Sequence, residues 1–166
     1  MSVRKKLQTG FVALVIAAGL IAPPARAEKL QVVSRDAQIM HVLDQYLDAL
    51  NALDMEAHVA TYHFPHYRHA SGVIAVWHTP LEAMPILNVP KAERRARIRD
   101  ALAPDWHRSA WTRRDIVQAD DTKVHVVTTF VRLREDGGQI ASYDSLYVLT
   151  YQDDRWAIKG RSSFAP

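Results

Sequence analysis

The chain has 166 residues, of which 21 are basic, 18 are acidic and none is cysteine. This length suits one domain rather than two, and an apolar share of 48% is ordinary for a globular protein. The lack of cysteine excludes disulfides, thiolate metal ligands and a cysteine nucleophile.

Residues 1–27 have the layout of a cleaved secretory signal peptide. A basic stretch, M-S-V-R-K-K, precedes a short apolar run, and the segment ends with A-R-A. We therefore expect residues 1–27 to be removed, residues 28–166 to form a single domain, and the protein to be periplasmic or secreted. An uncleaved membrane anchor is the alternative interpretation.

Cleavage would change the charge balance of the protein. It removes four of the 21 basic residues (Arg4, Lys5, Lys6 and Arg26) and no acidic one, which leaves 17 basic against 18 acidic residues. The mature domain then lacks the net positive charge that is typical of nucleic-acid-binding proteins. We expect neither nucleic acid nor, after cleavage, a membrane as a partner.

The first half of the mature chain predicts helices and a hairpin. Apolar residues at helical spacing predict a helix over residues 34–53. A second helix is expected from Met55 to about Tyr62, with Pro65 ending it, because a proline disfavours helical geometry in the residue before it. A short hairpin over residues 66–78 follows, with its turn at Ser71-Gly72.

The second half of the chain predicts a sheet. Thr79-Pro80 starts another helical region, and residues 91–102 form a highly charged helix whose arginines are best explained as a solvated face. From Trp111 onward the apolar residues alternate, which predicts strands over residues 111–119, 123–135, 139–151 and 155–164. The turns between these strands are short, so the strands form an antiparallel meander.

Two-residue turns at Asp136-Gly137 and Asp153-Asp154 set the register of the last three strands. The face that looks like core then carries Val124, Val126, Thr128, Phe130, Arg132, Tyr143, Ser145, Tyr147, Leu149, Tyr151, Trp156, Ile158, Gly160, Ser162 and Phe164. The opposite face carries Lys159, Arg161 and Ser163 together with apolar residues such as Leu146 and Val148. That face is too apolar for plain solvent surface, which indicates a second copy as its partner. A slip of one residue would exchange the two faces.

The order of these elements resembles that of the nuclear transport factor 2-like superfamily, which includes ketosteroid isomerase, scytalone dehydratase and SnoaL-like polyketide cyclases. The resemblance spans the mature chain and rests also on "YLDALNALDMEAHVATYHFPHYRHASG" and "YDSLYVLTYQDDRWAIKGRSSFAP". It implies an α+β fold in which N-terminal helices form a cone packed in a strongly curved antiparallel sheet around a deep apolar pocket. It also implies a homodimer through the outer sheet face.

Residues 62–69, Y-H-F-P-H-Y-R-H, are the main candidate site. The resemblance places a catalytic acid or base just after the second helix, where the isomerases have an aspartate and this chain has none. His66 is the nearest substitute, because a histidine exchanges protons near neutral pH. On a strand Arg68 shares its face with His66, where it could hold a carboxylate or an enolate. In the alternative interpretation His66 caps helix carbonyls and Arg68 pairs with an acid.

The same stretch is a poor metal site. Pro65 breaks the helix that would align His63, His66 and His69, and on a strand the last two point to opposite faces. No acidic residue lies between Glu56 and Glu82 to complete a local set of ligands. Neither a metal nor a cofactor is expected, since nucleotide-binding, zinc-protease and nucleophile-elbow motifs are also missing.

Further residues are expected to line the pocket and bind a ligand: Tyr62, Trp77, Trp111, Arg132, Tyr143 and Tyr147. An inward-facing Arg132 needs a partner, either Asp115 or an anionic ligand. The sequence therefore predicts an exported pocket protein for an apolar or weakly anionic small molecule. The alternatives are an isomerase, dehydratase or cyclase that uses His66 as acid or base, and an assembly module with a vestigial pocket.

Overall fold

The computed structural model describes residues 33–165, so the predicted signal peptide lies outside the described residues. The elements are α1 (Arg35–Ala52), α2 (Met55–Ala60), β1 (Tyr62–Ala70), β2 (Val73–Trp77), α3 (Pro80–Ala83), the 3-10 helix η1 (Pro85–Asn88), α4 (Lys91–Leu102), β3 (Arg108–Ala119), β4 (Lys123–Leu133), β5 (Gln139–Gln152) and β6 (Arg155–Ser163). No helix within residues 33–165 is long and apolar enough to cross a membrane.

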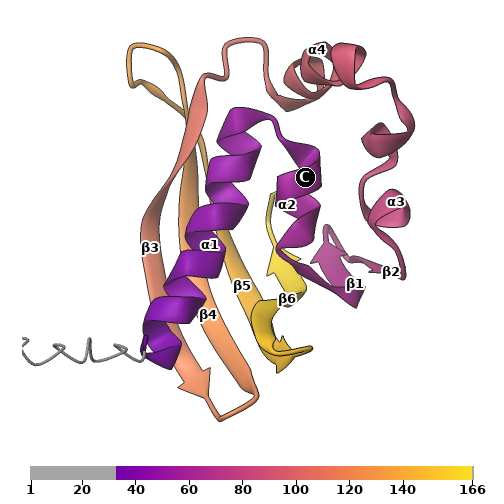
Figure 1. Cartoon of the computed structure of the whole chain (residues 1–166). Coiled ribbons are helices and arrows are strands. Elements are labelled where there is room, and N and C mark those ends of the chain that lie inside the picture. The colour runs from indigo at the N-terminus through magenta and orange to yellow at the C-terminus, as the bar shows by residue number, and fades with distance from the viewer. Residues whose placement is uncertain (1–32, 166) are drawn as a thin grey trace, which may run out of the picture. The chain divides into compact units, whose positions relative to one another are not determined.

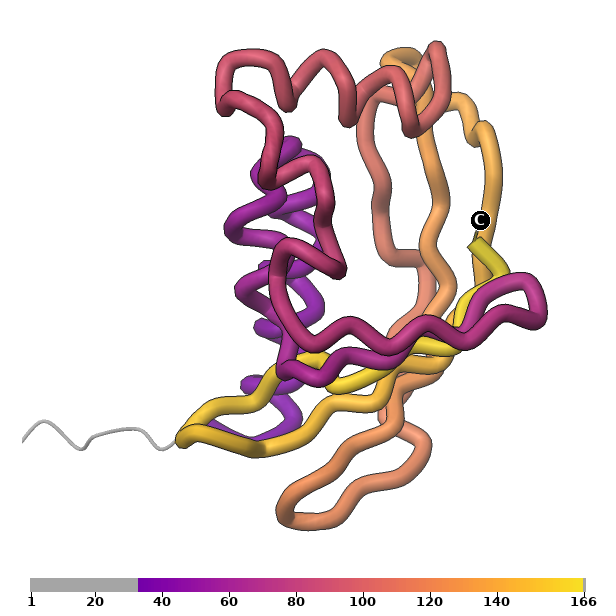
Figure 2. Tube along the Cα trace, turned by 90° about the vertical axis from the view of Figure 1, so that its right-hand side faces the viewer, coloured from indigo at the N-terminus to yellow at the C-terminus, as the bar shows by residue number. Residues whose placement is uncertain are grey.

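The strands form one six-stranded sheet in the order β2-β1-β6-β5-β4-β3. Neighbouring strands are antiparallel except for β1 and β6, which are parallel. Helices α1 and α2 lie against one side of this sheet (Figure 1), and the side view shows how strongly the sheet bends (Figure 2). The predicted α+β fold, with helices packed in a curved sheet, is confirmed, and it contains one parallel strand pair.

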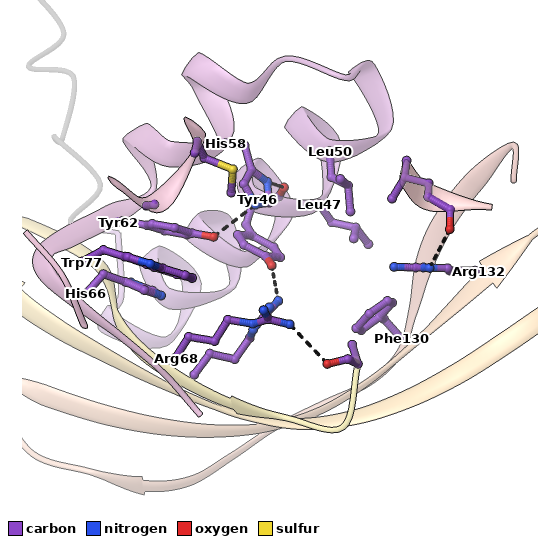
Figure 3. A pocket seen from close by; sticks show the side chains of 15 residues that line it. Tyr46, Leu47, Leu50, His58, Tyr62, His66, Arg68, Trp77, Phe130 and Arg132 are labelled. Carbon is purple, nitrogen blue, oxygen red and sulfur yellow. Dashed lines mark hydrogen bonds between the residues drawn. The ribbon is translucent and has the colours of Figure 1, made fainter. Parts of the chain in front are cut away.

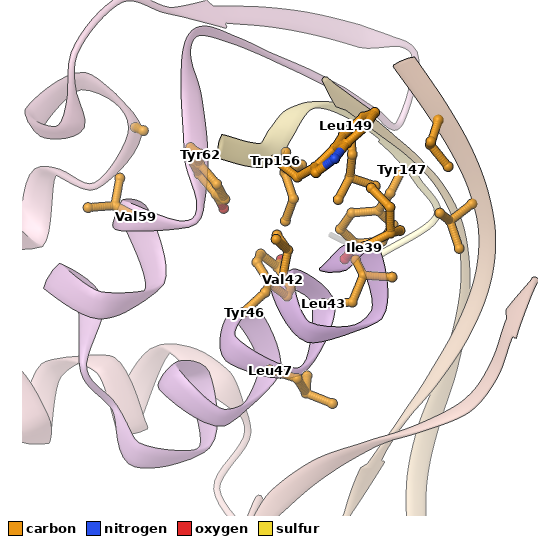
Figure 4. Close-up of a cluster of buried hydrophobic side chains, with 14 residues drawn as sticks. Ile39, Val42, Leu43, Tyr46, Leu47, Val59, Tyr62, Tyr147, Leu149 and Trp156 are labelled. Carbon is orange, nitrogen blue, oxygen red and sulfur yellow. The ribbon is translucent and has the colours of Figure 1, made fainter. Parts of the chain in front are cut away.

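The core lies between α1 and the sheet. Ile39 and Leu43, which are one turn apart on α1, are fully buried. They belong to one cluster with residues of β4, β5 and β6, among them Val126, Tyr147 and Ile158 (Figure 4). Removal of apolar surface from water contributes about 25 cal/mol per Å². The packing of α1 against β4, β5 and β6 is therefore a main source of the stability of the fold.

The second helix ends earlier than the sequence predicts. Thr61 closes α2, because both its backbone N–H and its hydroxyl donate to the carbonyl of His58, at 3.2 and 2.7 Å. The carbonyl of Thr61 then accepts from the backbone N–H of Ile158 at 2.9 Å, which directs the chain along β6. Tyr62 therefore begins β1, and Pro65 lies inside that strand. The prediction that the helix extends to Tyr62 and that Pro65 ends it was wrong.

The predicted register of β4 and β5 is confirmed. Val126 lies opposite Tyr147, and Phe130 lies opposite Tyr143. The fully buried side chains of Val126 and Tyr147 face the core, as the alternation predicts. The end of β5 differs, since Tyr151 is 41% exposed rather than part of the core.

The register of β6 is correct only as far as Ile158. Ile158 lies opposite Leu149, but the preceding β5 residue, Val148, lies opposite Gly160, so Lys159 is an extra residue in a β-bulge. A bulge exchanges the two faces of the strand beyond it. The prediction that places Gly160, Ser162 and Phe164 in the core and Lys159, Arg161 and Ser163 outside was therefore wrong beyond the bulge. Arg161 and Ser163 face inward, and Phe164 is 84% exposed.

Gly160 permits the close approach of β1 at this bulge. A Cβ atom added to Gly160 would lie 3.4 Å from both the Cβ and the carbonyl oxygen of Tyr67. These distances are at the near limit of ordinary van der Waals contact, so β1 passes close to the backbone of Gly160 where it pairs in parallel with β6. The position of β1, and with it the candidate site, depends on this approach.

Candidate functional site

A cavity of about 260 Å³ lies at the side of the cone where α1 and α2 meet β1 and β6 (Figure 3). Of the residues that the sequence suggests, the cavity is lined by Tyr62, His66, Arg68, Trp77 and Arg132. The structure adds residues that sequence analysis missed, of which the most important are Tyr46, His58, Phe130 and Arg161. No aspartate or glutamate of the described chain lines the cavity.

One wall of the cavity is a stack of three flat rings. The ring of His66 lies on that of Tyr62, with centroids 4.0 Å apart and planes at 13°. Its other face is turned to Trp77, with centroids 5.7 Å apart and planes at 7°. The antiparallel pairing of β1 and β2 places His66 directly opposite Trp77. The stack buries His66, which is 2% exposed, and presents a flat aromatic surface.

The two histidines of the cavity are held in their neutral form. Burial lowers the pKa of His66 to about 4, although its Nδ1 lies 3.1 Å from the carbonyl oxygen of Ile158. In the neutral ring the Nδ1–H donates to that carbonyl, so Nε2 keeps its lone pair. His66 therefore bonds a strand carbonyl of β6, and the expectation that it caps helix carbonyls was wrong.

His58 orients the ring of Tyr62. Burial lowers the pKa of His58 to about 4. Its Nδ1–H donates to the carbonyl oxygen of Tyr46 at 2.9 Å, which leaves Nε2 to accept from the hydroxyl of Tyr62 at 3.2 Å. Burial also raises the pKa of Tyr62, so its hydroxyl stays protonated and donates this bond.

Arg161 is a positive charge held among tyrosines. Its Nη1 donates to the hydroxyl oxygens of Tyr46 and Tyr147, the latter at 3.4 Å, and its guanidinium carbon lies 6.0 and 5.8 Å from the two ring centroids. Burial opposes this charge, but the surrounding tyrosine oxygens outweigh it and raise the pKa of Arg161 above its usual value. Within residues 33–165, Arg161 forms no ion pair with a carboxylate.

Sequence analysis missed Arg161 because of the bulge. The one available signal is Gly160, since a glycine inside a strand often marks a bulge or a close backbone approach. A prediction that included a bulge at this glycine would have placed Arg161 on the inner face of the sheet and Phe164 on the outer face.

Arg68 and Arg132 bring two further guanidinium groups to the cavity. Arg68 lies beside Arg161 in the β1–β6 pair, and its Nη2 donates to the carbonyl oxygen of Ala165 at 3.3 Å. Burial, and then the charge of Arg161, lower the pKa of Arg68. Arg132 donates to the carbonyl oxygen of Leu102 at 3.3 Å, with its guanidinium carbon 5.3 Å from the ring centroid of Tyr143.

The expected partner of Arg132 lies elsewhere. Asp115 forms an exposed ion pair with Arg113, at 2.6 Å, so the prediction that Asp115 neutralises Arg132 was wrong. The β3–β4 pairing places Asp115 opposite Val127, an outward-facing residue, whereas Arg132 faces the cavity. Arg132 thus keeps its charge in the cavity with a backbone carbonyl as its hydrogen-bond partner.

The remaining predicted residues lie behind the cavity wall. Tyr147 is fully buried and reaches the site only through its contact with Arg161. Trp111 donates its indole N–H to the carbonyl oxygen of Leu43 at 3.2 Å, and Tyr143 packs beneath Arg132. None of these three is among the residues that line the cavity.

The other histidines of the Y-H-F-P-H-Y-R-H stretch point elsewhere. His63 lies within 3.1 Å of the hydroxyl of Thr150, and His69 is exposed. In the described part of the chain, no three histidine, aspartate or glutamate side chains gather into a set that could hold a metal ion.

The cavity therefore combines a flat aromatic wall with guanidinium groups, and no aspartate or glutamate among residues 33–165 lines it. Guanidinium groups bind carboxylates through paired, charge-assisted hydrogen bonds. The rings suit a flat apolar body. The arrangement is complementary to an organic anion.

Comparison with known proteins identifies the family to which the chain belongs. Residues 35–163 match the family described as NTF2-like protein (DUF6841). No curated protein matches the sequence.

Solved structures share the fold at low identity. An NTF2-like protein of unknown function from Shewanella oneidensis MR-1 is 16% identical with a TM-score of 0.59, covering 79% of this chain and 99% of its own. An NTF2-like protein from Cytophaga hutchinsonii is 14% identical with a TM-score of 0.57, covering 81% and 100%. A ketosteroid isomerase-like protein from Erwinia carotovora is 19% identical with a TM-score of 0.51, covering 77% and 93%. At such identities the likeness shows the fold alone.

The buried histidines predict how stability depends on pH. Both His58 and His66 have folded-state pKa values near 4, below the ordinary 6.5. Between these values the unfolded chain binds protons that the folded chain does not. The free energy of unfolding should therefore be fully retained above pH 6.5 and fall as the pH drops toward 4, by up to about 1.4 kcal/mol per pH unit for each histidine.

Urea unfolding across this pH window measures the slope. His58→Gln should make the slope shallower by the share of one histidine, and the exposed His41→Gln is the matched control. If the free energy of unfolding of His58→Gln depends on pH as strongly as that of the unaltered protein, the lowered pKa of His58 is contradicted.

Proposed function

The chain belongs to the DUF6841 family of NTF2-like proteins, and we propose that within this fold it is a pocket protein that binds a small organic anion with a flat apolar body. One observation carries the proposal: the cavity is lined by Arg132 and Arg161, which form no ion pair within residues 33–165, and by no aspartate or glutamate of the described chain. Cations in a partly buried site are costly unless an anion compensates them. A bound anion supplies that compensation.

In this proposal each part of the ligand has its own place in the cavity. The negative group lies at the end where Arg161 is held by Tyr46 and Tyr147. The flat body lies along the stack of Tyr62, His66 and Trp77. Because hydrogen bonds and stacking already fix these side chains, little ordering is needed when the ligand binds.

Acid–base catalysis at His66 is the second candidate. It is favoured by the neutral imidazole, whose Nδ1–H is occupied by Ile158 and whose Nε2 keeps a lone pair. A pKa of about 4 nevertheless makes His66 a weak base at neutral pH. No carboxylate of the described chain lines the cavity to act with it. The proposal therefore favours binding over catalysis.

A homodimer through the outer face of the sheet remains a proposal. A groove on that face includes Tyr67 and Ile74, which are 44% and 69% exposed, together with Leu146 and Val148. Apolar side chains gathered in this way are typical of protein–protein interfaces.

Calorimetry with 2-naphthoate and its neutral amide tests the proposed ligand class. The acid should bind at least about tenfold more tightly than the amide, since a charge-assisted hydrogen bond is worth roughly 1.5–3 kcal/mol. Arg161→Met should remove this difference, whereas Arg113→Met, which changes an exposed arginine on β3, should keep it. Equal affinity of acid and amide for the unaltered protein would contradict the proposal, whatever the folding of the variants.

The stability of His66→Ala decides between a structural and a catalytic histidine. The substitution removes a buried ring from between Tyr62 and Trp77 and leaves the Ile158 carbonyl without its donor. We expect a loss of about 2 kcal/mol or more in the free energy of unfolding, measured with urea. The exposed His69→Ala on the same strand is the control. A fully stable His66→Ala protein would favour the catalytic role instead.

Light scattering tests the proposed dimer. Leu146→Lys places a charge in the middle of the outer-face groove and should yield monomers. Leu81→Lys changes an exposed leucine on α3, which does not line the groove, and should leave the mass unchanged. A monomeric unaltered protein, or a dimeric Leu146→Lys protein, would exclude this interface.

A further inference from the structure

We propose that the cavity has two separate anionic subsites, so that its ligand is a dicarboxylate whose negative groups lie at opposite ends of a flat body. Arg161 holds the first carboxylate and Arg132 the second. This inference rests on the proposed function, because it specifies the ligand of the same cavity.

The backbone positions of the two arginines are well separated along the sheet. Arg161 lies opposite Tyr147, which lies opposite Val126 on β4. Arg132 is six residues beyond Val126, which is roughly 20 Å along a strand at about 3.3 Å per residue. Both side chains nevertheless line the same cavity, so they reach into it from different ends.

Aromatic side chains lie between the two ends. Figure 3 shows Tyr46, the hydrogen-bond partner of Arg161, on the side of the ring stack, and shows Arg132 beside Phe130 at the opposite side of the cavity. Phe130 lies across from Tyr143, the residue under Arg132. A rigid aromatic ligand can therefore run past Phe130 and present one carboxylate to each end.

The Arg132 end has the features of a binding position. Its guanidinium is fixed by the Leu102 carbonyl and by the ring of Tyr143, which leaves further N–H groups for a ligand. Neither Arg132 nor Arg161 forms an ion pair with an acidic residue between residues 33 and 165. One carboxylate would neutralise only one end of the cavity, and two would neutralise both.

Three probes with the same ring system separate the possibilities. 2-Naphthoate carries one carboxylate, 2,6-naphthalenedicarboxylate carries two at opposite ends, and 2,3-naphthalenedicarboxylate carries two side by side. Calorimetry on the unaltered protein should show the 2,6-diacid binding at least about tenfold more tightly than 2-naphthoate. The 2,3-diacid should not share this gain, because its carboxylates cannot reach both arginines.

Variants then locate the second subsite. In the Arg132→Met protein the 2,6-diacid should bind no more tightly than 2-naphthoate does to the same variant, so the preference for two carboxylates is lost. Arg134→Met is the matched control, since Arg134 lies two residues farther on, is exposed and pairs with Asp105. It should preserve the preference for the 2,6-diacid.

Each outcome assigns failure to one proposal. If 2-naphthoate binds no better than its amide, the proposed function fails. If 2-naphthoate binds and the 2,6-diacid is no tighter, or the 2,3-diacid gains equally, the two-subsite inference fails while the proposed function stands. Equal loss of both 2-naphthoate and diacid binding in a folded Arg132→Met protein would likewise overturn the assignment of Arg132 to a second subsite.

Discussion

The inward charge of Arg161 is the constraint on which the site depends. A β-bulge at Lys159 turns this side chain into the cone, and β1 passes close to Gly160 beside it, where it pairs with β6. Tyr46 and Tyr147 stabilise the guanidinium with hydroxyl oxygens rather than with a carboxylate. The charge is therefore solvated by the protein but not neutralised, and an anion can still gain from binding it.

His58 and His66 are neutral and therefore add no positive charge to the cavity. His58 and His66 each donate Nδ1–H to a backbone carbonyl, from Tyr46 and Ile158 respectively. These bonds select the Nδ1–H tautomer and fix the ring planes, while burial lowers both pKa values to about 4 and keeps the rings neutral. Among the described residues that line the cavity, the positive charge thus comes from arginines, which hold their charge at any physiological pH.

Sequence periodicity predicts those parts of the fold where the alternation of residues is unbroken. The register of β4 and β5 could be predicted because Val126, Phe130 and Tyr147 alternate with outward residues. The shared face of His66 and Arg68 followed from the same period. Arg161 could not be placed, because a single extra residue reverses the pattern. Tyr46 and His58 were missed because on helices their spacing is that of ordinary core residues.

The fold provides a cavity, and the charges that line it determine which ligands it suits. A proton-abstracting enzyme needs a base whose pKa lies near the working pH, usually beside a group that stabilises the developing oxyanion. Here Arg68, Arg132 and Arg161 offer more than enough positive charge to stabilise an oxyanion. A suitable base is missing from the described lining, since burial makes His66 a weak base. A cavity rich in fixed cations and poor in bases stabilises an anion that is already formed. The physical chemistry of the lining therefore favours recognition of a carboxylate over its generation.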